Sequence, residues 1–229
     1  SSANEYCQPV NPYSNEAPIV FISSALEVGG DAYLAVLAHE LQHMIHWHTD
    51  PNEDAWLNEG ASELAELLNG YGWSSVTIGQ FARQPDVQLD AWAAQGATLS
   101  AHYGASFLFL HYYLHRFGMD ALRRLLRSRA NGLAAVQQEL AGDGGMSLDD
   151  LVADWAVANL VDAQVSAGEW PDDATARYSY PELDLAAEAE TVVGRLPLTI
   201  VSEVSPQGTD YYELGGEAAR GVRLTFAAD

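Results

Sequence analysis

The chain has 229 residues, 48% of them hydrophobic, so it can bury a core of ordinary globular size. Its 32 acidic residues face only 10 basic ones, all of them Arg, and the formal net charge is -22. Such a surface repels phosphate backbones and anionic lipid, so we expect no nucleic-acid partner. No apolar run reaches the roughly 18 residues of a spanning helix, which argues against membrane insertion.

The first elements in chain order are expected to be one strand and one long helix. The segment APIVFISS (17–24) is apolar and lies between a Pro and a Gly pair, and this pattern predicts a strand. Asp31 is a good N-cap for a helix that continues to about His48. Further helices are expected over 54–69, 99–117, 119–129, 132–141 and 148–163.

Two end signals support these helices. Gly118 stands where a residue with positive φ commonly ends a helix. Ser147 with Asp150 forms a variant of the capping box at the start of the last helix.

After about residue 190, β-branched and alternating segments separated by Pro or Gly predict strands. We therefore expect a mainly helical domain over 1–189 and the start or part of a β-strand module over 190–229.

The chemistry of the chain is concentrated in HELQHMIHWH, residues 39–48. His39 and His43 lie one helical turn apart and can bind one ion, with Glu40 beside them as a general base. Catalytic zinc takes three protein ligands and leaves one position to water. His43 and Glu59 lie equally far from the predicted turn between two antiparallel helices, which makes Glu59 the expected third ligand. By the same count Glu63 stands level with His39 and is expected to orient it.

HELQH followed by WLNEGASE resembles the gluzincin metallopeptidases, most of all the bacterial hyicolysin-type and immune-inhibitor-A-like peptidases. The connecting segment is shorter than in the better-known gluzincins. The resemblance implies a zincin-like fold, one catalytic Zn²⁺ and hydrolysis of peptide bonds. It also implies a helical Tyr that stabilises the oxyanion, and SAHYGASFLFL offers Tyr103 or the adjacent His102 for this role, with packing of the cleft floor as the alternative.

Other histidines receive different interpretations. The metzincin pattern fails, because it needs Gly where the chain has His46 and His where it has Thr49. His46 is an alternative ligand or, preferably, a hydrogen-bonded histidine whose positive form suits the helix end. His48 is expected at the surface. His111 and His115 repeat the spacing, but their aromatic surroundings favour a packed helix over a second metal site.

A calcium site is a weaker alternative in the turn after the first helix. Asp50, Asn52 and Asp54 have the alternate spacing of a calcium loop. Pro51 intrudes, however, and Ala55 stands where such loops have Gly. Roles in ending one helix and starting the next explain these residues better than Ca²⁺.

The sequence as a whole predicts an α+β, zincin-like zinc metallopeptidase, secreted or at the cell surface, with its signal peptide outside this sequence. An edge strand over 17–24 is expected to pair with an extended peptide substrate. Two other classes stay open, a zinc-binding module without turnover and a non-peptide zinc hydrolase. The sequence does not determine the oligomeric state or the peptide specificity.

Overall fold

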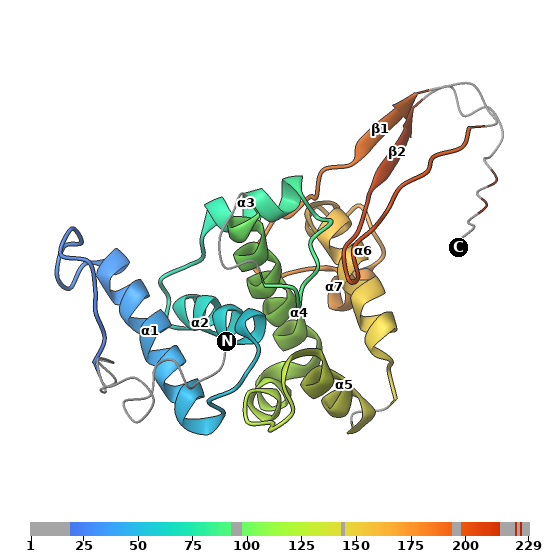
Figure 1. The fold of residues 1–229 in the computed structure, drawn as a ribbon. Coiled ribbons are helices and arrows are strands. Elements are labelled where there is room, and N and C mark those ends of the chain that lie inside the picture. Colours follow the sequence, from blue (N-terminus) through green and yellow to red (C-terminus); the bar gives the residue numbers. More distant parts are fainter. Residues whose placement is uncertain are drawn as a thin grey trace.

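The computed structural model describes residues 19–92, 98–142, 145–193, 198–215, 223 and 225. Within these ranges the chain is mostly helical, with one small parallel sheet (Figure 1). The elements are α1 (Asp31–Thr49), α2 (Ala55–Leu68), α3 (Ser75–Arg83), α4 (Leu99–Leu125), α5 (Gly132–Gly142), α6 (Leu148–Ser166), α7 (Asp172–Tyr178), β1 (Glu190–Val193) and β2 (Tyr212–Gly215). None of the helices in the described ranges is long and apolar enough to cross a membrane.

Helix α4 is the centre of the packing and contacts α2, α3, α5 and α7. Two glycines allow the closest of these approaches. A Cβ at Gly60 of α2 would lie 2.6 Å from the backbone oxygen of Ser106, and one at Gly104 would lie 2.3 Å from that of Thr77. Any side chain at either position would push the helices apart. This packing fixes α2, which in turn positions α1.

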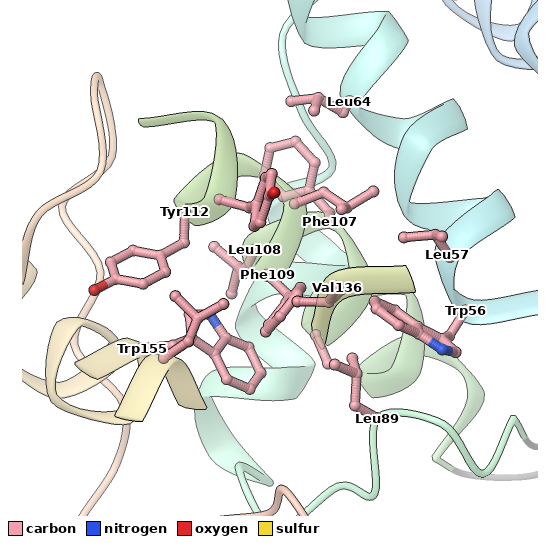
Figure 2. Close-up of a cluster of buried hydrophobic side chains, with 14 of the residues drawn as sticks. Trp56, Leu57, Leu64, Leu89, Phe107, Leu108, Phe109, Tyr112, Val136 and Trp155 are labelled. Carbon is pink, nitrogen blue, oxygen red and sulfur yellow. The ribbon is translucent and has the colours of Figure 1, made fainter. Parts of the chain in front are cut away.

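Large apolar side chains from four helices fill the core around α4 (Figure 2). Trp56, Leu57 and Leu64 of α2 meet Phe107 and Phe109 of α4 in this cluster. Trp155 of α6, which has an exposed fraction of 1%, stacks on Phe81 and meets Phe109 edge to face. Trp155 is therefore a core residue.

Most of the predicted helix signals are confirmed, but Asp31 is not the N-cap of the first helix, because Gly30 holds that position and Asp31 lies in the first turn of α1. The first two helices form with nearly the expected bounds, and the capping box of Ser147 and Asp150 opens α6. The expected helices on either side of Gly118 appear as one element, α4, that is broken at this residue by its positive φ of 81°. Sequence patterns missed α3 and α7.

The predicted strand over 17–24 is wrong for its described part, because residues 19–24 form no strand and have no strand partner there. Its first two residues lie outside the described ranges. The expected edge for an extended substrate is therefore absent from 19–24. Ile19 and Phe21 are instead exposed, at 57% and 72%.

The C-terminal strands form only in part. β1 and β2 pair in parallel, with Glu190 opposite Tyr212. The segment 198–204 is not a strand, and most of the expected strand residues after 215 lie outside the described residues. The β-pair is connected to the helices by hydrogen bonds, including Glu188 N to Ala82 O and the Tyr211 hydroxyl to Ala156 O.

Candidate metal centre

Helices α1 and α2 lie side by side, joined by a short turn (Figure 1). Near the turn, the Nδ1 atom of His43 lies 3.1 Å from Asn58 Oδ1. Further from the turn, the Nδ1 atom of His39 lies 3.0 Å from Glu66 Oε1. These two contacts show that the helices run antiparallel. The expected pairing of α1 with α2 is therefore present.

The other ring nitrogens converge on one carboxylate. The Nε2 atoms of His39 and His43 each lie 3.4 Å from Oε2 of Glu59. Zinc bonds of about 2.1 Å in a tetrahedral arrangement would hold two ligand atoms about 3.4 Å apart. Glu59 Oε2 is buried and has no hydrogen-bond partner among the described residues. The three predicted ligands therefore form a group that can hold a metal ion.

Both histidines are held in the orientation that metal binding requires. Because a carboxylate only accepts, His39 donates its Nδ1 hydrogen to Glu66. His43 Nδ1 lies 3.1 Å from the Asn58 oxygen and 3.0 Å from the Ser62 hydroxyl. Such partners fix the ring and the tautomer of a metal-binding histidine, so that Nε2 is the atom left for the metal.

The charges of the site follow from these contacts. Burial alone would lower the pKa of His39, but Glu59 and Glu66 outweigh it and raise that pKa to about 10. Burial alone would raise the pKa of Glu59, but contact with the two imidazoles lowers it to about 2. The pKa of His43 is also raised, because Glu59 outweighs burial. Protons on the imidazoles thus balance the carboxylate, and a metal ion would replace them.

Glu63 does not make the hydrogen bond expected of it. Glu66, one turn further along α2, is the partner of His39. Oxygen atoms of Glu63 and Glu66 and a ring nitrogen of His39 lie within 4.8 Å of one another, so Glu63 acts on His39 through its charge. Burial, followed by repulsion from Glu66, raises the pKa of Glu63 to about 7.

The candidates for water activation and oxyanion binding have different surroundings. Glu40 is half-buried next to His39 on α1. Burial raises the pKa of Tyr103 to about 12, and the negative charges of Glu59, Glu63 and Glu40 raise it further. Tyr103 therefore shares the surroundings of the metal group. His102 packs on Trp92 with ring centroids 5.8 Å apart, and burial lowers its pKa.

His46 is not the charged residue that the sequence suggests. It is only 2% exposed, and its Nε2 atom lies 3.8 Å from Oε2 of Glu53. Burial lowers the pKa of His46, which favours the neutral form. Among the described residues, His46 belongs to no group that could hold a metal. His48 is exposed, as predicted.

The two weaker metal hypotheses gain no support. Asp50 Oδ1 accepts a hydrogen bond from Asn52 N, and the Asn52 side chain contacts Asn131. Both contacts serve the turn and its packing. His111 packs on Phe107 and Tyr180. The groups among the described residues that could hold a metal ion include neither the turn residues nor His111.

Sequence reasoning missed Glu66, Asn58 and Ser62. All three lie on α2 and contact the two histidines of α1. Ser62 and Glu66 follow Glu59 at helical spacing, and Asn58 lies one turn before Ser62. The helical period could therefore have indicated these residues. Counting residues from the turn instead selected Glu63 as the partner that orients His39.

Comparison of the chain with models of known protein families found no match. A search of curated proteins likewise found none.

Proposed function

We propose that the protein is a zinc-dependent peptidase in which His39, His43 and Glu59 hold the metal and Glu40 is the general base. The observation that carries the proposal is the convergence of two Nε2 atoms on Glu59 Oε2, each at 3.4 Å. Two imidazoles and one carboxylate are the ligand set of hydrolytic zinc sites that keep one position open.

Each residue has a defined task in this reaction. A bound zinc ion would activate a water molecule and polarise the scissile carbonyl. Glu40, which is beside the ligands but is not one of them, accepts the proton of that water and delivers it to the leaving amine. The Tyr103 phenol, protonated because its pKa is about 12, donates a hydrogen bond to the oxyanion.

The supporting shell keeps the ligands in place. Glu66 orients His39, while Asn58 and Ser62 orient His43. Orientation before the reaction lowers the cost of reaching the productive geometry. The resemblance of HELQH and NEGASE to gluzincins supports the same assignment, and the proposal includes the extracellular location that such enzymes have.

The test is cleavage mapping of a mixed peptide library by mass spectrometry, with zinc-loaded wild type and the Glu40→Gln variant. We expect Glu40→Gln to keep one zinc ion per chain and to lose about 10²- to 10⁴-fold in cleavage rate. Glu169→Gln, an exposed carboxylate far along the chain, is the control for the loss of one charge.

Three outcomes would contradict the proposal. A zinc-loaded wild type that cuts no peptide would indicate a zinc-binding module without turnover. Equal cleavage by wild type and Glu40→Gln would remove Glu40 from the mechanism. Ester substrates cleaved in place of amides would favour a non-peptide hydrolase.

A further inference from the structure

Helix α1 is apolar on all sides but has little cover. Between Ala32 and Thr49 its only formally charged residue is Glu40, whereas α6, which also has 19 residues, carries four Asp residues. A helix that is apolar all round is typically buried. In α1, however, only His46 is fully buried. Among the described elements α2 is the one that packs extensively against α1, which lies at the edge of the helical part (Figure 1).

The open side of α1 is opposite the proposed metal ligands. Leu41 lies two residues from both His39 and His43, and Ile45 lies two residues after His43. Two residues turn an α-helix by about 200°, so Leu41 and Ile45 point away from α2. Leu41 is 43% exposed and Ile45 is 62% exposed. An apolar surface is therefore open on the side that does not carry the metal group.

This side has the residue spacing of a paired helix. Leu34, Ala38, Leu41, Ile45 and His48 follow one another at intervals of four, three, four and three residues. We call these five residues the α1 stripe. A mean interval of about 3.5 residues is that of the seam between two coiled helices. Leu34 and Leu41 take the d positions and Ile45 an a position, and this combination favours a two-stranded contact.

Charge indicates that the partner helix belongs to a second copy of the chain. The net charge of -22 opposes self-association wherever acidic side chains meet. The α1 stripe has no acidic residue and no Arg, and its flanking positions Leu37, Gln42 and Met44 are uncharged as well. A basic or acidic partner would form no ion pair there, although such flanking pairs commonly select a different partner. The same stripe of another copy matches it in both apolar character and charge.

We propose that α1 is a dimerisation helix, and that two copies of the chain pack along the α1 stripe about a two-fold axis near Leu41. Leu41 is the middle residue of the stripe, so it meets its counterpart in the second copy, as a two-fold contact requires. His39 and His43 face α2 on the other side, which keeps the metal group out of the contact. The inference does not depend on the proposed peptidase activity.

The first test is sedimentation equilibrium of the chain between about 1 µM and about 100 µM. We expect the wild type to be a dimer in this range. Ile45→Glu brings two like charges into an apolar contact and should raise the dimer dissociation constant at least about 100-fold. Val76→Glu, at a residue of α3 that is 66% exposed, adds the same charge elsewhere and should keep the dimer. A wild type that is monomeric throughout would overturn the proposal.

The second test uses opposite charges at the centre of the stripe. Leu41→Glu and Leu41→Arg should each dissociate, because like charges meet at the two-fold axis. An equimolar mixture should form a mixed dimer at least about tenfold tighter than either variant forms alone. Circular dichroism confirms that both variants keep the helical content of the wild type. Folded variants that remain dimeric alone, or that form no mixed dimer, would overturn the contact at Leu41.

Salt distinguishes this contact from a charge-paired one. Raising the salt concentration from about 0.05 M to about 0.5 M screens the repulsion between two acidic chains, so the dimer should become tighter. A dimer that weakens with salt would show a contact through ion pairs and overturn the proposal. A monomeric wild type that unfolds at a lower temperature after Ile45→Glu would also overturn it, because the chain itself would then cover the α1 stripe.

Discussion

The chain contains the His-x-x-x-His spacing twice, and the two copies have opposite surroundings. On α1, His39 and His43 face Glu59 of the neighbouring helix, which raises the pKa of both histidines despite their burial. The ring nitrogens not directed at Glu59 also have polar partners. This pair, with Glu59, forms a group that could hold a metal ion.

On α4, the same spacing serves packing. His111 is 4% exposed between Phe107 and Tyr180, and burial lowers its pKa to about 4. His115 lies 3.4 Å from the backbone oxygen of Thr175. A helix thus provides the spacing of two imidazoles, but the element packed against it decides whether they can bind a metal.

Removing Glu59, the carboxylate that distinguishes the two histidine pairs, should have the largest effect on zinc binding. We expect Glu59→Ala to lose tight zinc binding, a greater loss than the ~100-fold effect of changing an outer partner. His115→Ala, on the packed pair, is the control and should keep one zinc ion per chain. Metal analysis after dialysis measures both, and full zinc content in Glu59→Ala would refute the ligand assignment.

Protons should compete with the metal at the first pair. The folded pKa of His39 is raised from 6.5 to about 10, so its proton stabilises the metal-free fold fully below 6.5 and progressively less as the pH rises through 10. Zinc must displace this proton, so its affinity should rise about tenfold per pH unit for each proton released near neutral pH. Calorimetry in buffers of different ionisation enthalpy counts the released protons, and a count of zero would contradict the account.

A smaller effect on zinc binding is expected from the residue that orients His39. Glu66→Gln weakens the hydrogen bond that fixes the ring, and we expect zinc affinity to fall about 10- to 100-fold. Glu63→Gln, which makes no such bond, should change the affinity far less. Competition with a chromophoric chelator gives both constants. The reverse order would return the orienting role to Glu63.

The packed pair should affect stability and not metal binding. In the folded protein the pKa of His111 is lowered from 6.5 to about 4. The neutral His111 therefore contributes fully to the free energy of unfolding above pH 6.5, and this contribution is lost as the pH falls towards 4. The loss amounts to about 1 kcal/mol between a pH of about 7 and about 5.5. Denaturant unfolding of His111→Phe should show a flatter pH dependence over this range. An unchanged slope would show that His111 does not titrate as described.

Helices were predictable here because their signals are local. Apolar periodicity and the capping residues at Ser147 and Gly118 specify them without tertiary information. α3 was missed because its Ser-Val-Thr-Ile start is β-branched, and packing against α4 decides its state. The strand expected over 17–24 failed for a related reason, since a strand needs a partner that a local pattern does not reveal.

The candidate site was predictable to the level of its ligands. Counting residues from a turn places Glu59 opposite His43, because both positions lie close to the turn. The same count fails by one turn at Glu66, because small deviations in helix crossing accumulate with distance from the turn. The neutral state of His46 also depends on the burial that α2 and its turn impose, which the sequence does not show.

The most direct test of the central claim is anomalous diffraction at the zinc absorption edge from crystals of the zinc-loaded protein. The account predicts one peak within bonding distance, about 2.0 to 2.2 Å, of His39 Nε2, His43 Nε2 and a Glu59 oxygen. A peak at His111 and His115, or none beside Glu59 in a protein that retains zinc, would contradict it.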